Sequence, residues 1–178
     1  MLSLSAVAGW EASVLASVRG AIGTLDERDR QIERSGLYGE YPAIVGAYVE
    51  LFDEEESGLE ALKRAVFLLW YGAVEPRCLT GIPELPDRLA RRTVEELETR
   101  ARRGTADDEL TRMLAWYHHR APAVFDVWGA GPAMAALATS VPPEAWRSAR
   151  VDSATLRDRG QLGTYWRALT SEGRTGAT

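Results

Sequence analysis

The chain has a single cysteine, Cys78, among its 178 residues. One cysteine excludes an internal disulfide and any cysteine-based metal cluster within one chain, and it fits a reducing compartment. Long hydrophobic runs are also missing: the longest, from Ala65 to Val74, is ten residues, about half of what a membrane-spanning helix needs. The apolar start of the chain has no positively charged segment before it, which argues against a secretory signal. These absences predict a soluble protein of the cytoplasm that does not contact a membrane.

A strongly basic region is missing as well. Residues 1–75 carry 13 acids and 6 bases, a net charge of -7, whereas residues 76–178 carry 13 acids and 15 bases, a net charge of +2. Proteins that bind nucleic acid usually present a strongly basic face. We therefore expect no nucleic-acid partner.

Recognised catalytic motifs do not occur: there is no phosphate-binding loop, dinucleotide fingerprint, Gly-x-Ser-x-Gly elbow or metalloprotease motif. The two histidines, His118 and His119, are adjacent, so on a helix they point about 100° apart. Neither has a histidine or carboxylate three or four residues further along, the spacing that helical metal sites use. The sequence thus favours a noncatalytic protein over an enzyme, and it predicts no catalytic residue, no metal ion and no cofactor.

Helical periodicity is the pattern that is present. Apolar residues recur at intervals of three and four, and almost no stretch alternates with period two. Hydrophobic residues make up 46% and charged residues 26%, a balance typical of a globular protein. We predict an all-α fold, a single-domain bundle of about six to eight helices in antiparallel hairpins with no sheet. Residues 1–170 form this domain, and residues 171–178 form a disordered tail.

Turn and capping residues give the predicted helix boundaries. Thr24 and Glu27 have the spacing of a capping box, Thr105 can cap a later helix, and Pro122 should kink or divide that helix. The helix that ends near Glu75 is apolar all round in its second half, which indicates a central position. The predicted helices cover residues 5–20, 24–35, 42–52, 58–75, 87–103, 105–128, 133–139 and 153–169, with an ordered loop over 77–86 and hairpins over 41–76 and 87–128.

One group of candidate binding residues surrounds the end of the central helix. A carboxylate at the end of a buried helix needs a buried partner, and for Glu75 a structural ion pair or carboxylate cap is the favoured interpretation. The alternative is a small-molecule or metal-dependent enzyme with a pocket between helices 58–75 and 105–128, since pockets between bundle helices are common. The candidate residues are Trp70, Tyr71, Glu75, Arg77, Trp116, Tyr117 and His118.

A second group of candidates predicts a protein interface. The chain has six tryptophans, and the outer face of helix 87–103 is rich in arginine; aromatic and arginine side chains are the usual anchors of interfaces. Our leading hypothesis is a noncatalytic helical protein-interaction module, an adaptor, regulator or immunity-type binder. A third hypothesis is a self-associating structural component, whose tryptophans would be buried against a second copy as a homo-oligomer. The candidate interface residues are Arg88, Arg91, Arg92, Trp128, Trp146 and Trp166.

Overall fold

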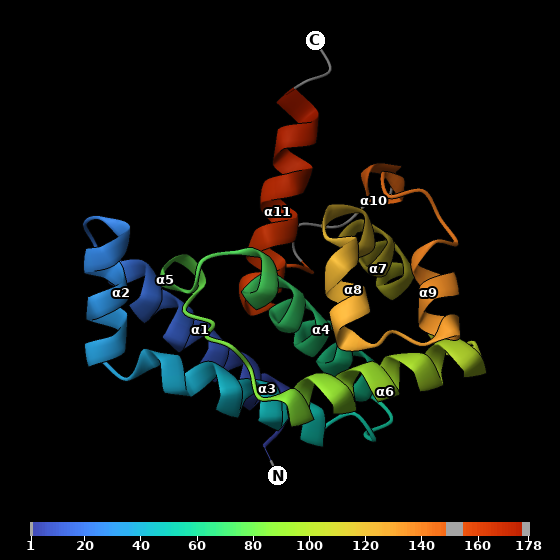
Figure 1. Ribbon diagram of the computed structural model, residues 1–178, viewed down its shortest axis with the longest axis horizontal. Coiled ribbons are helices and arrows are strands. Elements are labelled where there is room, and N and C mark those ends of the chain that lie inside the picture. Colours follow the sequence, from blue (N-terminus) through green and yellow to red (C-terminus); the bar gives the residue numbers. More distant parts are fainter. Residues whose placement is uncertain (1, 149–154, 176–178) are drawn as a thin grey trace.

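The computed structural model describes residues 2–148 and 155–175, and these residues form helices and no strand (Figure 1). The all-α prediction is confirmed. Within the described residues, seven helices have ten or more residues, which fits the predicted six to eight, and the others are shorter. The elements are α1 (Leu4–Gly20), α2 (Leu25–Arg34), η1 (Leu37–Gly39), α3 (Glu40–Glu50), α4 (Gly58–Val74), α5 (Arg77–Thr80), α6 (Asp87–Arg103), α7 (Asp108–Arg120), α8 (Pro122–Trp128), α9 (Pro132–Ala138), α10 (Ala145–Ser148) and α11 (Gly160–Thr175).

Local signals set several boundaries as predicted. The Thr24 hydroxyl accepts a hydrogen bond from the Glu27 amide at 3.3 Å, and the Glu27 carboxylate accepts one from the Thr24 amide at 2.7 Å, which completes the capping box. Pro122 divides the predicted helix 105–128 into α7 and α8, because its ring disfavours a helical conformation of Ala121, whose φ and ψ are -152° and +70°. No helix in the described residues is long and apolar enough to cross a bilayer.

Other boundaries differ from the prediction. Asp107, and not Thr105, caps α7, since its carboxylate accepts a hydrogen bond from the Leu110 amide at 2.8 Å. The predicted loop 77–86 begins with the short helix α5. The last helix starts at Gly160, whose φ of +54° lies in the left-handed region, and continues to Thr175, beyond the predicted start of the tail. Residues 153 and 154 of the predicted last helix and residues 176–178 of the predicted tail lie outside the described residues.

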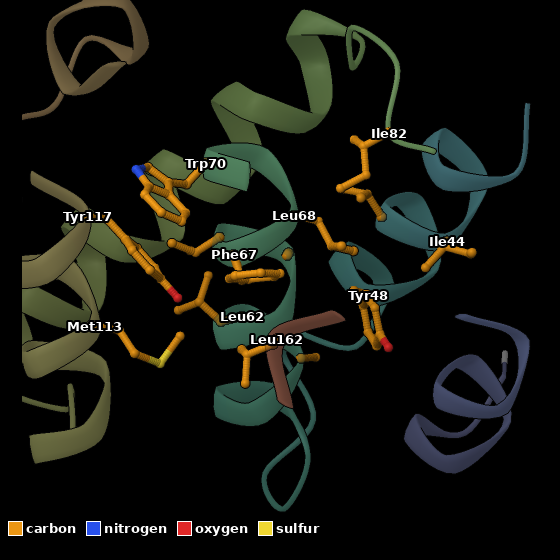
Figure 2. Packing of buried hydrophobic residues seen from close by; sticks show 14 of the residues in the cluster. Ile44, Tyr48, Leu62, Phe67, Leu68, Trp70, Ile82, Met113, Tyr117 and Leu162 are labelled. Carbon is orange, nitrogen blue, oxygen red and sulfur yellow. The ribbon is translucent and has the colours of Figure 1, made fainter. Parts of the chain in front are cut away.

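Helix α4 is the centre of the core, as its apolar second half predicted. Every side chain from Ala61 to Trp70 is buried, and α4 packs against α3, α6 and α11. In Figure 2 the ring of Phe67 lies in the middle of this core, and Trp70 faces Tyr117 of α7. The core therefore joins the two ends of the chain around one helix.

Helices α6 and α7 do not form a simple packed hairpin. Helix α9 packs against both of them, and α6 also packs against α4 and α3. Glu98 of α6 accepts hydrogen bonds from the amides of Ala133 and Met134, at 3.2 and 2.8 Å, and so caps the start of α9. The predicted hairpin 87–128 therefore packs with α9 in contact with both of its long helices, an arrangement that the prediction did not include.

A buried cluster of charges fastens the start of α11 to the rest of the fold. The Arg159 side chain is only 9% exposed. Its guanidinium donates to Glu60 of α4 at 2.5 and 2.7 Å and to Glu109 of α7 at 2.5 Å. Lys63 bridges Glu109 and Asp107 at 2.5 and 2.6 Å. Three elements distant in sequence thus meet through charge-assisted hydrogen bonds.

Glu11 makes a second polar connection to α11. It is 1% exposed, and its carboxylate accepts hydrogen bonds from the Gln161 amide at 2.8 Å and the Tyr48 hydroxyl at 2.7 Å. Burial raises the pKa of Glu11, although both hydrogen bonds act in the opposite direction. Gly160 leaves room for this carboxylate, since a Cβ there would overlap it. A residue of α1 therefore caps the first turn of α11, where the helix dipole favours an acid.

The charge cluster predicts a pH-dependent contribution to stability. Burial alone would raise the pKa of Glu109, but hydrogen bonds from Arg159 and Lys63 outweigh it and lower the pKa from 4.5 to about 2. Because the folded pKa lies below the unfolded one, ionised Glu109 stabilises the fold above about pH 4.5, and this contribution is lost as the pH falls toward 2. We expect Glu109→Gln to cost about 1–2 kcal/mol at pH 7, a figure kept low because a third of the side chain is exposed.

Urea unfolding of the wild type and of Glu109→Gln between pH 7 and pH 2.5 checks this prediction, and the difference between them should shrink steadily below pH 4.5. Asp108→Asn is the matched control, because Asp108 is 98% exposed and its nearest cation, Arg112, is 3.9 Å away. An Asp108→Asn effect of the same size and pH dependence would contradict the assignment to the cluster.

Candidate functional site

A groove of about 640 Å³ lies between the end of α4, the loop 81–86, the start of α6 and the end of α8. We call it the α6–α8 groove. Its floor and walls are mainly apolar, and charged side chains stand at its rim. It is lined by Leu69, Gly72, Ala73, Arg77, Ile82, Pro83, Glu84, Leu85, Asp87, Ala90, Arg91, Val127, Trp128 and Gly129.

Two glycines hold the loop wall of the groove in place. Gly81 ends α5 with a φ of +76°, and a Cβ there would lie 2.5 Å from the Val18 side chain. A Cβ on Gly72 of α4 would lie 2.6 Å from the Ile82 side chain. Both positions need glycine, the first for its backbone conformation and the second for close approach. The loop therefore packs tightly against α1 and α4, and the groove has a firm wall.

The end of α8 supplies the most exposed apolar residue of the groove. Gly129 ends α8 in the left-handed region, with a φ of +68°. Val127, in the last turn, is 85% exposed. The adjacent Trp128 is half-buried, with its ring 5.5 Å from that of Phe125. A partner that covered Val127 would remove its exposed apolar surface from water, which favours binding.

The two arginines at the rim differ in whether they are paired within the protein. Arg77 donates to Asp29 of α2 at 2.8 Å, and its guanidinium lies 4.6 Å from the centre of the Tyr38 ring. The hydrogen bonds from Arg77 and Tyr38 lower the pKa of Asp29. Arg91, in contrast, is exposed and makes no ion pair with any described residue. Arg91 is therefore free to pair with an acid from outside.

The predicted interface residues separate into two sets. Arg91 and Trp128 meet in the α6–α8 groove. Arg88 lies near them on α6, exposed and without an ion pair among the described residues, whereas Arg92 pairs with Glu96 at 3.2 Å. Only part of the arginine-rich face is thus neutralised within its own helix.

Trp146 and Trp166 belong to the core and do not face outward. They are 4% and 5% exposed. Their rings pack edge to face at 6.0 Å, and Trp146 also packs against Trp116 at 5.5 Å. The Trp166 indole donates to the Tyr117 hydroxyl at 3.2 Å. These two tryptophans stabilise the fold where the sequence suggested an interface.

Aromatic rings fill the space between α4 and α7 where the sequence suggested a pocket. Trp70 and Tyr117 stack with their centres 4.4 Å apart (Figure 2). Tyr71 stacks on Phe67 at 5.0 Å, and the Trp116 indole donates to the Tyr165 hydroxyl at 2.7 Å. These four candidate residues therefore pack against other rings.

Glu75 and His118 occupy different surroundings from each other. Glu75 is exposed after the end of α4; its backbone amide donates to the Tyr71 carbonyl at 3.0 Å, but its carboxylate makes no hydrogen bond or ion pair with the described residues. His118 packs edge-on against Phe125 at 5.1 Å, and Cys78 is buried. Neither Glu75 nor His118 lines the α6–α8 groove. Within the described residues, no three His, Cys, Asp or Glu side chains gather as metal ligands would.

Sequence reasoning missed Val127, Leu85 and Ile82, which line the groove. The signal that was available for Val127 is the triplet of Val127, Trp128 and Gly129, in which two large apolar residues come directly before a glycine that ends the helix.

The chain matches no protein-family model, no curated protein and no solved structure. Function is therefore inferred from geometry and chemistry.

Proposed function

We propose that this chain is a noncatalytic helical protein-interaction module, an adaptor, regulator or immunity-type binder, and that a partner segment docks in the α6–α8 groove. The observation that carries the proposal is the meeting of exposed Val127, half-buried Trp128 and unpaired Arg91 around one apolar groove. Tryptophan and arginine are the residue types that most often dominate binding energy at interfaces.

The chemistry of the groove defines the partner segment. An apolar side chain of the segment would cover Val127 and Trp128, because each square ångström of apolar surface removed from water contributes about 25 cal/mol. An acidic residue beside it would pair with Arg91, and Glu84 and Asp87 at the same rim would repel a second acid. The fitting occupant is a short peptide segment with an apolar anchor and one acid.

A peptide library displayed on phage provides the test. The library is selected on the wild-type protein, and the enriched peptides are synthesised and titrated by isothermal calorimetry. We expect enriched peptides to carry an apolar anchor next to an acid, and Trp128→Ala to weaken their binding about tenfold or more. Val127→Glu should have a similar effect, because it places a charge on the apolar rim.

Ile22→Glu is the matched control, because Ile22 is 74% exposed and does not line the groove. It should leave binding within about twofold, as surface substitutions away from a site do. Failure to enrich any peptide, or equal binding to Trp128→Ala and wild type, would overturn the proposal. A wild-type dimer that Val127→Glu dissociates in native mass spectrometry would instead identify a second copy as the occupant, which is the self-associating alternative.

A further inference from the structure

A second groove, of about 660 Å³, lies between α1 and the segment that leads into α11. We call it the α1–α11 groove. The α1 wall presents small exposed residues, Ser5, Gly9, Ala12 and Ala16, with Leu15 beneath them. The other large α1 side chains that line the groove, Leu4 and Arg19, lie at the two ends of the helix, so another backbone can approach the small residues between them closely.

The charge of the α1–α11 groove is opposite to that of the whole chain. Four arginines and one acid, Asp158, line it, whereas the chain has a net charge of -5. Arg64 is neutralised by Glu60 at 2.8 Å. The three other arginines are exposed and make no ion pair with the described residues. They are Arg19, Arg157 and Arg167.

The placement of these arginines distinguishes between kinds of anion. Arg19 is at the end of α1, Arg157 precedes α11, and Arg167 is two turns into α11. A single phosphate or carboxylate is held best by cations that converge on one point. These cations instead lie in three separate segments beside α1, a helix of 17 residues that is about 25 Å long. Such spacing suits a ligand that carries several acids at intervals.

We propose that the α1–α11 groove binds an acidic, amphipathic helical segment of a partner protein. Its small apolar face lies against Gly9, Ala12 and Ala16, and its glutamates or aspartates pair with Arg19 and Arg167. Helices approach each other closely where small residues face the contact, and complementary charge fixes the register of the bound segment.

This inference does not rest on the α6–α8 groove, because the two grooves share no lining residue. If both grooves are occupied, one chain bridges two partner segments, which is what an adaptor does. The variants that test one groove leave the other unchanged, so failure of either proposal is recognised separately.

The probe is a fluorescein-labelled helical peptide of about 16 residues, long enough to follow α1, made of alanine, leucine and glutamate with the leucines four residues apart. A second peptide has glutamine in place of glutamate. Binding is measured by fluorescence anisotropy with the full chain. We expect the glutamate peptide to bind about tenfold or more tightly than the glutamine peptide, and its affinity to fall as salt is raised.

Two protein variants test charge and space independently. Arg19→Glu combined with Arg167→Glu should weaken binding about tenfold or more, because attraction becomes repulsion at two points. Ala12→Phe should also weaken it without changing charge, because the ring fills the groove. The matched control is Arg30→Glu combined with Arg103→Glu, two exposed arginines without ion pairs among the described residues and outside the groove.

The expected result is loss of binding in both groove variants and binding within about twofold of wild type in the control. An equal loss of binding in the control would show that the effect comes from the net charge of the protein and not from the groove, and it would overturn the proposal. Normal binding to Ala12→Phe, equal binding of the two peptides, no binding of either, or preferential binding of a labelled oligothymidine would each overturn it as well.

Discussion

Arg159→Ala is expected to lower the free energy of unfolding by about 3 kcal/mol, measured by urea denaturation at pH 7. The guanidinium is buried between Glu60 and Glu109, with hydrogen bonds of 2.5 to 2.7 Å. Its removal leaves Glu60 paired only with Arg64 and Glu109 paired only with Lys63, so both carboxylates lose charge-assisted hydrogen bonds. Removing one member of a buried ion pair costs more than the pair contributes, because the remaining charge stays partly out of water.

Two further variants distinguish the effect of breaking the charge cluster from the effect of removing any arginine. Arg157→Ala, two residues earlier and exposed, should change stability by less than about 0.5 kcal/mol. Arg159→Lys should recover only part of the loss, because an ammonium group lacks the planar fork with which Arg159 binds both oxygens of Glu60 and still reaches Glu109. Equal losses for Arg157→Ala and Arg159→Ala would show that the cluster does not fasten α11.

Trp70→Ala is expected to cost about 4 kcal/mol, in the range of aromatic-to-alanine changes in cores. Trp70 is 2% exposed, and its ring stacks on Tyr117 at 4.4 Å and lies edge-on to Tyr165 at 5.5 Å. The substitution would leave a cavity where the Trp70 ring of α4 packs against Tyr117 of α7 and Tyr165 of α11. Thermal and urea unfolding followed by circular dichroism measure the loss.

Trp70→Phe should cost less than half as much. The Trp70 indole N–H has no hydrogen-bond partner among the described residues, so phenylalanine loses packing area and no hydrogen bond. Trp128→Ala should cost under about 1 kcal/mol, because half-buried Trp128 lies at the rim of the α6–α8 groove. A larger loss for Trp128→Ala than for Trp70→Ala would contradict this division between core and surface tryptophans.

Much of the helical framework could be predicted because its signals are local. The capping box of Thr24 and Glu27 lies within four residues, and Pro122 acts on the residues beside it. The cap of α7 was misplaced by two residues because Thr105 and Asp107 are both good capping residues. In the structure the Asp107 carboxylate accepts the hydrogen bond from the Leu110 amide and also pairs with Lys63 of another helix, a contact that sequence spacing does not show.

The candidate site was predicted less completely. Arg91 and Trp128 were identified by residue type, and the structure brings them into one groove. Residue type could not distinguish Trp128 from Trp146 and Trp166, because all three lie in segments of weak periodicity. Only the packing against Trp116 and Tyr117 places the latter two in the core.

By itself, the sequence determined that this chain is all helical, where most of its helices begin and end, and that α4 is central. Those properties depend on hydrogen bonds and apolar spacing within a few residues of each position. The tertiary structure alone decided that Glu11 caps a helix that starts 149 residues later, that Arg159 joins α4 to α7, and which tryptophan borders a groove. These contacts form between segments distant along the chain, so their partners are chosen by how the whole core packs.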